Sequence, residues 1–260
     1  MTPLQVARKH PEVVTGLLAA AGLAWWWTVE RMDGMDASPG TDLGTLGWFT
    51  ATWALMMAAM MLPSFAPTLT AYMTLMRRRR ASRWLLFAGG YLLAWTAAGV
   101  AAYGVIELGK GLLAGNLAWN DDGRWLAGGV LAAASAYQLI PCKRACLAHC
   151  RGQLRDLDGV SRQGWSAALT SGARSGGWCI GSSWALMAAL FALGIMSLTW
   201  MALIAALVAI EKTSAWPLRA RLVTAAVLGV LAVGLLAAPH QLPGLVVPSH
   251  AGMHPMKAMG

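Results

Sequence analysis

Charged residues are scarce in this chain of 260 residues, because Asp, Glu, Lys and Arg together make up only 12%. That is about half the share in an ordinary soluble domain. So little charge excludes a disordered chain and a coiled coil, and it argues against a two-domain soluble enzyme of this length. Four cysteines are too few for a disulfide-stapled mini-protein. Phosphate-loop, nucleophile-elbow, zinc-protease and dinucleotide motifs are also missing from the sequence.

Hydrophobic residues, in contrast, make up 57% of the chain, and 14 Trp stand against four Tyr and four Phe. Tryptophan is the residue that gathers at membrane–water boundaries. The composition therefore predicts an all-α protein, a polytopic membrane helix bundle whose first partner is the lipid bilayer. We expect residues 1–260 to form a single integral membrane domain.

Uncharged runs of roughly 20 residues are long enough to cross a bilayer as helices, and they predict about seven spans. The first run ends in three Trp where a cleavage site would need small residues, so we expect an uncleaved helix. The predicted helices cover residues 13–29, a segment from about 48 kinked at Pro63 and Pro67, 84–106, 125–140, two helices within 175–210 separated by a turn at 194–199, and 222–238. Residues 1–46 would then hold the first helix and an outer loop, 47–238 a six-helix core, and 239–260 a flexible tail.

The loop charges favour one orientation of these helices. With the N-terminus in the cytoplasm and the C-terminus outside, 16 of the 20 Lys and Arg lie on the cytoplasmic side. This asymmetry follows the positive-inside rule and accounts for the net charge of +9 without a nucleic-acid partner.

A short internal repetition suggests a further symmetry. The run Trp53-Ala-Leu-Met56 recurs as Trp184-Ala-Leu-Met187, in helices predicted to cross in opposite directions. The six helices after the first could form a 3+3 inverted repeat, a plan common in transporters. Chance similarity in a chain rich in these residues is the alternative.

Three cysteines follow the fourth predicted helix at helical spacing, namely Cys142, Cys146 and Cys150. Pro141 is suited to the first position of a new helix, on which these residues share one face. Eight residues rise about 12 Å, so a single ion could bind two of them, completed by the neighbouring His149 or by Cys179 at the expected start of the fifth helix. Thiols at the cytoplasmic edge stay reduced, which favours a metal site for Cu(I) first and Zn(II) second. The alternative is that these cysteines are small apolar packing residues.

Methionine and histidine provide two further sets of soft donors. Met57, Met60 and Met61 share a face in the second predicted helix and could line a path for Cu(I), although adaptable helix packing is the alternative. The C-terminal tail contains several His and Met residues and could form an outer metal site. The alternative is that it is an ordinary polar tail. Its candidate ligands are His250, Met253, His254 and Met256. Glu211, an acid at the end of a predicted span, is a further candidate.

Four sequence blocks together resemble a bacterial family of predicted metal-binding integral membrane proteins. These blocks begin at Trp53-Ala-Leu-Met-Met, Pro141-Cys-Lys-Arg-Ala-Cys, Cys179-Ile-Gly-Ser-Ser and Glu211-Lys212. The family includes a membrane copper chaperone needed to mature a bacterial tyrosinase. The resemblance implies a bacterial inner membrane and points to Met57, Met60, Met61, Lys143, Cys146, Cys150, Cys179 and Glu211. The sequence departs at Ser182 and Ser183, where many relatives are expected to carry cysteine.

These observations predict a membrane protein that binds Cu(I) and hands it to a copper-dependent enzyme, such as a tyrosinase-type oxidase, without catalysing a reaction itself. Two alternatives remain open. One is a thiol-redox membrane protein, although the cysteines lack Cys-x-x-Cys spacing. The other is a small-solute or metal transporter in which Cys and Met serve for packing.

Overall fold

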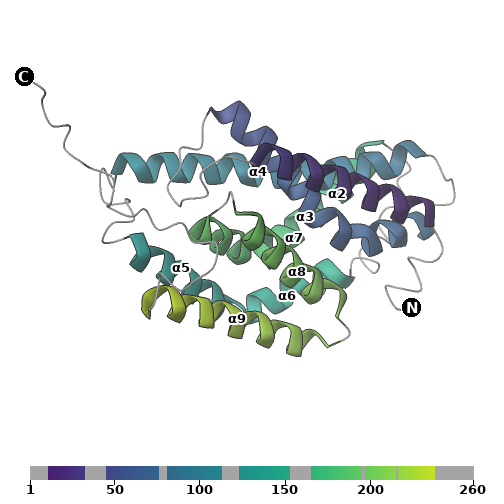
Figure 1. The fold of residues 1–260 in the computed structure, drawn as a ribbon. Coiled ribbons are helices and arrows are strands. Elements are labelled where there is room, and N and C mark those ends of the chain that lie inside the picture. Colours follow the sequence, from purple (N-terminus) through teal and green to yellow (C-terminus); the bar gives the residue numbers. More distant parts are fainter. Residues whose placement is uncertain are drawn as a thin grey trace, which may run out of the picture.

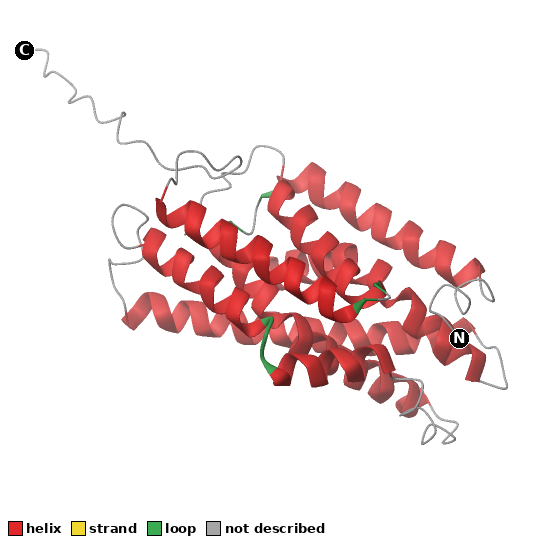
Figure 2. Cartoon of the chain, turned by 90° about the horizontal axis from the view of Figure 1, so that it is seen from below, coloured by secondary structure: helices red, strands yellow, loops and turns green. Residues whose placement is uncertain are grey.

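The computed structural model describes residues 11–32, 45–75, 81–112, 123–152, 165–194, 197–214 and 216–237. Over these ranges the chain forms eight α-helices and no strand, which confirms the all-helical prediction (Figures 1 and 2). They are α2 (Pro11–Met32), α3 (Leu46–Leu75), α4 (Ala81–Leu112), α5 (Gly123–Tyr137), α6 (Pro141–Gly152), α7 (Trp165–Leu193), α8 (Leu198–Thr213) and α9 (Pro217–Ala237).

Four of the helices in the described ranges are long and apolar enough to cross a membrane, namely α3, α4, α7 and α9. A fifth span results if α5 and α6, which meet at a bend of 69°, are counted as one broken span. Helices satisfy all of their backbone polar groups internally, which is what a bilayer requires. Several helices carry exposed Trp near an end, as expected at a membrane interface: Trp27, Trp48, Trp125, Trp165 and Trp216. The count of seven spans and their orientation stay predictions.

Helix α7 lies at the centre of the bundle. It packs against α4 on one side and against α5 and α6 on another, and it also contacts α8 (Figure 1). Around this centre α2 packs on α3, α3 packs on α4 and α8, and α9 packs on α5. Residues of α7 can therefore meet side chains from four other helices.

Glycines let α4 and α7 approach closely. A Cβ at Gly172 would collide with the carbonyl oxygen of Phe87, and a Cβ at Gly90 would collide with that of Leu169. At Gly176 the added atom would lie 2.7 Å from the Ala94 Cβ. Small residues four apart are a common device for close helix contact in membranes. This contact brings α4 against the stretch of α7 that contains Cys179.

Two predicted helix boundaries are confirmed. Pro141 begins α6, because its fixed φ suits a first helical position and it needs no N–H partner. The predicted turn after α7 is present, and Gly194 adopts a φ of 109°, which favours glycine. The start of the fifth predicted helix is corrected: α7 begins at Trp165, so Cys179 lies in the middle of a candidate span rather than at its start.

The two copies of the short repeat have different surroundings. Trp53 is buried, and its Nε1 donates a hydrogen bond to the Trp95 carbonyl oxygen at 2.8 Å. Trp184 is exposed and meets the Tyr137 ring edge-on. The inverted repeat therefore stays a prediction from the sequence.

Candidate metal site

The Cys179 thiol is fully buried at the contact of α7 with α4 and α8. Its Sγ lies 3.0 Å from the hydroxyl oxygen of Tyr91 and accepts a hydrogen bond from Lys212 Nζ at 2.8 Å. Close packing of α4 on α7 delivers Tyr91, while the tight turn after α7 returns the chain as α8 and delivers Lys212. The Cys179 sulfur thus lies between a neutral hydroxyl group and a cationic donor inside the bundle.

Lys212 extends this contact to α3. Its Nζ lies 3.3 Å from the Ser64 Oγ and 3.8 Å from the Met61 Sδ. Lys212 and Met61 are both buried, so the ammonium group contacts the Ser64 hydroxyl and two sulfur atoms in place of bulk water. Three helices thus meet at one lysine.

A second thiol reaches the same place from α6. The side chain of Cys150 lies close enough to those of Cys179 and Ser182 to interact with them electrostatically. Cys150 is partly exposed, whereas Cys179 is not. We call Met61, Cys150 and Cys179 the sulfur cluster; it combines two thiols and one thioether around Lys212 Nζ.

The two serines that replace expected cysteines lie beside Cys179. Ser182 and Ser183 both donate a hydrogen bond to the Cys179 carbonyl oxygen, at 2.9 and 2.6 Å. The Ser183 Oγ is also 3.9 Å from the Cys179 Sγ. Position 183 therefore adjoins the sulfur cluster but places a hydroxyl there in place of a thiol.

The remaining candidates on α6 form a more exposed group. Cys142 and Cys146 lie one turn apart on α6, and Cys142 is exposed while Cys146 is partly exposed. His149 is exposed, stacks on Trp178 with ring centroids 4.4 Å apart, and has its Nδ1 2.8 Å from the Ala145 carbonyl oxygen. That contact fixes the ring and leaves Nε2 as the nitrogen available to a ligand.

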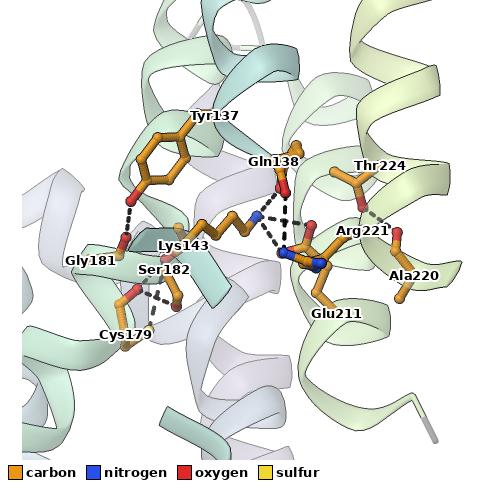
Figure 3. A network of polar contacts seen from close by, with 11 residues as sticks. Tyr137, Gln138, Lys143, Cys179, Gly181, Ser182, Glu211, Ala220, Arg221 and Thr224 are labelled. Atoms are coloured by element: carbon orange, nitrogen blue, oxygen red, sulfur yellow. Dashed lines mark hydrogen bonds and ion pairs between the residues drawn. The ribbon is translucent and has the colours of Figure 1, made fainter. Parts of the chain in front are cut away.

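Lys143 and Glu211, which the resemblance pointed to, are buried and form an ion pair of their own. Lys143 Nζ lies 2.9 and 2.7 Å from the two carboxylate oxygens of Glu211, and it also donates to the side-chain oxygen of Gln138 (Figure 3). Arg221 approaches the Gln138 carbonyl oxygen at 3.5 Å. This second network joins the α5–α6 bend to α8 and α9, next to the sulfur cluster because Glu211 and Lys212 are adjacent.

The structure thus brings Met61, Cys150 and Cys179 together and holds Lys143 and Glu211 in the adjoining network. Met57 and Met60 are buried in the core of the bundle. Cys142, Cys146 and His149 lie on α6 outside the sulfur cluster. The predicted outer ligands His250, Met253, His254 and Met256 lie outside the described residues.

Three side chains at the centre of the site were not predicted from the sequence: Tyr91, Ser64 and Lys212. Lys212 belongs to one of the sequence blocks that resemble the family. Its position beside Glu211 at a predicted helix end is, however, typical of an ordinary charged residue. Only the uncharged surroundings of the Glu211-Lys212 pair at the end of a long apolar run could have indicated burial.

The donor set differs from that of a typical zinc site. Among the described residues, no three His, Cys, Asp or Glu side chains gather closely enough to hold a metal ion. The sulfur cluster instead offers two cysteines and a methionine, and Lys212 cannot be a ligand while it is an ammonium, since that group has no lone pair.

Comparison with known families adds one finding. A family model described as PpoB2 copper chaperone matches residues 50–236, well over half of the chain. The chain belongs to the PpoB2 copper chaperone family. No curated protein and no solved structure matches it significantly. The matched range contains the sulfur cluster and Lys212, and the family description supports a role in handling copper rather than in catalysis.

Proposed function

We propose that this PpoB2 family member is an integral membrane copper chaperone that binds Cu(I) at the sulfur cluster and delivers it to a copper-dependent enzyme. The single observation that carries the proposal is the meeting of the Cys179 and Cys150 thiols beside Met61, inside the bundle of a protein whose family is described as copper chaperones.

The donor chemistry favours Cu(I) over the alternatives. Thiolate and thioether sulfur are soft ligands and select Cu(I), whereas a structural zinc site wants four ligands from Cys, His or carboxylate. The cluster supplies two such ligands and a thioether that zinc rarely uses. Met57 and Met60 add two buried thioethers on the same helix as Met61.

The exposed end of α6 supplies a route between the buried cluster and a partner protein. Cys142 and Cys146 lie one turn apart toward the exposed side of α6, and Cys150 lies one further turn along, near Cys179. Cu(I) could move between these thiols by exchanging one sulfur ligand at a time, so that it is never without a soft donor. His149 stands beside this route, and a tyrosinase-type oxidase is the partner that the family resemblance suggests.

The membrane context completes the proposal. We place the chain in a bacterial inner membrane with seven spans, the N-terminus in the cytoplasm and the C-terminus outside, which the distribution of Lys and Arg supports. In this orientation the His and Met of the tail, at positions 250, 253, 254 and 256, would act as outer copper donors.

The test is copper content by mass spectrometry on detergent-purified protein loaded with Cu(I) under reducing conditions. The parent should retain close to one Cu(I), and Cys179→Ser and Cys150→Ser should each lose most of it. Cys142→Ser is the matched control, since it removes a thiol from the same helix as Cys150 but outside the cluster, and it should retain the ion. Equal, trace copper in the parent and in all variants would contradict the proposal.

The proximity of Cys150 and Cys179 also favours a second candidate, a thiol-redox membrane protein in which the two thiols form a disulfide and pass two electrons and two protons to a quinone-type oxidant. Membranes prepared in the presence of an alkylating reagent distinguish the two functions. The copper proposal expects no disulfide, so that both cysteines are recovered as alkylated thiols once the protein is unfolded in the reagent. A peptide pair linked through Cys150 and Cys179 would support the redox function instead.

A further inference from the structure

Lys212 is a buried cation placed directly against the thiol that the proposed function assigns to copper. Its Nζ lies 2.8 Å from the Cys179 Sγ and 3.8 Å from the Met61 Sδ, and the Ser64 hydroxyl at 3.3 Å completes its contacts. Such a group is unusual in a metal site, because a cation repels the ion that the site is meant to hold. Its position therefore needs a reason.

We propose that Lys212 makes the site selective for a monovalent soft ion by supplying one fixed positive charge to a pair of thiolates. This inference rests on the proposed function, because it takes Cys150 and Cys179 as the ligands. It assigns a specificity-determining role to a residue that does not itself bind the ion.

The argument is one of charge balance. Two thiolates carry two negative charges, and Lys212 cancels one of them. A monovalent ion cancels the other, so the loaded site is neutral, whereas a divalent ion leaves one uncompensated positive charge. Burying an uncompensated charge in a low-dielectric site costs free energy, whereas a site whose charges cancel avoids much of this cost.

Coulomb's law also predicts a preference for a monovalent ion over a divalent one. The repulsion between the Lys212 ammonium and an ion on Cys179 is twice as large for a divalent ion as for a monovalent one. At a separation of about 4 Å and an effective dielectric constant near 20, that difference corresponds to nearly a thousandfold in relative affinity.

The neighbouring groups do not change this balance. Glu211 is the closest acid in sequence, but both of its oxygens are engaged by Lys143, so that pair is neutral as a unit. Tyr91 and Ser64 contribute uncharged hydroxyl groups. Among the described side chains that face the cluster, Lys212 is thus the one that supplies the compensating positive charge.

The experiment compares the affinities of purified protein for Cu(I) and Zn(II), each by competition with a chelator of known affinity, in the parent, Lys212→Met, Lys212→Gln and Lys212→Arg. The parent and Lys212→Arg should prefer Cu(I) strongly. In Lys212→Met and Lys212→Gln the ratio of Cu(I) to Zn(II) affinity should fall by up to about a thousandfold. Lys212→Gln keeps a polar group near Ser64, so it provides a second neutral variant for this measurement if Lys212→Met does not fold.

The control variant is Arg219→Met, which removes a positive charge from the exposed start of α9, where Arg219 lies over the Trp216 ring. It should leave the affinity ratio unchanged, because Arg219 belongs neither to the sulfur cluster nor to the Lys143–Glu211 pair. An unchanged ratio in both neutral Lys212 variants would overturn the inference while leaving copper binding intact. A parent that binds no Cu(I) would instead overturn the proposed function, and the inference with it.

Discussion

The ammonium group of Lys143 lies between both carboxylate oxygens of Glu211, at 2.9 and 2.7 Å, with neither side chain exposed by more than 3%. This pair ties α6, which carries Cys150, to α8, which carries Lys212. Because the two helices otherwise share few contacts, the ion pair is well placed to fix how Cys150 approaches the sulfur cluster.

Breaking this pair should be costly. Glu211→Gln leaves Lys143 buried with an uncompensated charge, and we expect the free energy of unfolding to fall by about 3 kcal/mol. The measurement is thermal unfolding in detergent. The double variant Lys143→Met/Glu211→Leu should recover much of the loss, because it removes both charges together. Glu30→Gln, at an exposed position, is the control; an equal effect of the two Gln variants would show that the pair does not hold α6.

The contact of α4 with α7 should depend on Gly172. Gly172→Ala places a methyl group against the Phe87 carbonyl oxygen, which is backbone and cannot move aside alone. We expect a lower unfolding temperature and weaker Cu(I) retention, because Tyr91 follows Phe87 on α4 by one turn and would be displaced from Cys179. Gly177→Ala is the matched control on the same helix, since a Cβ there meets nothing within 4 Å. Equal stability of the two variants would contradict the close helix contact.

The four cysteines should react with an alkylating reagent in an order set by their exposure. Cys142 is exposed and should react first, Cys146 and Cys150 more slowly, and Cys179 only after unfolding. Loading with Cu(I) should protect Cys150 while leaving Cys142 reactive. Mass spectrometry of the labelled peptides measures both effects. Protection of Cys142 with no change at Cys150 would place the ion at the exposed end of α6 instead of in the sulfur cluster.

Restoring a thiol at position 183 should strengthen copper binding. The Ser183 Oγ lies 3.9 Å from the Cys179 Sγ, so Ser183→Cys adds a soft donor beside the cluster. Retention of Cu(I) against a competing chelator should rise about tenfold, equivalent to about 1.4 kcal/mol. Ser183→Ala removes the hydroxyl without adding sulfur and should leave retention close to that of the parent. A Cys variant no better than the Ala variant would mean that position 183 cannot reach the ion.

Several features of the fold could be predicted from local signals. The helical class, the start of α6 at Pro141 and the turn near Gly194 all follow from hydrophobic run length and from the backbone preferences of Pro and Gly. The start of α7 was missed because Arg174 interrupts the uncharged run, and a single charge at an exposed helix position does not end a helix. That error placed Cys179 at a helix end when it lies in the middle of α7.

Local sequence signals are enough to identify this chain as helical, apolar enough for a membrane, and supplied with sulfur at helical spacing, because each of these properties depends on residues close together along the chain. Which sulfur atoms meet depends instead on how the helices pack. Met61, Cys150 and Cys179 lie on three different helices. They meet because α6 packs on α7 and because α8, which follows the turn at Gly194, packs on both α3 and α7. The same packing buries Lys212 among them, because the orientation of a helix end is set by its neighbours and not by its own sequence.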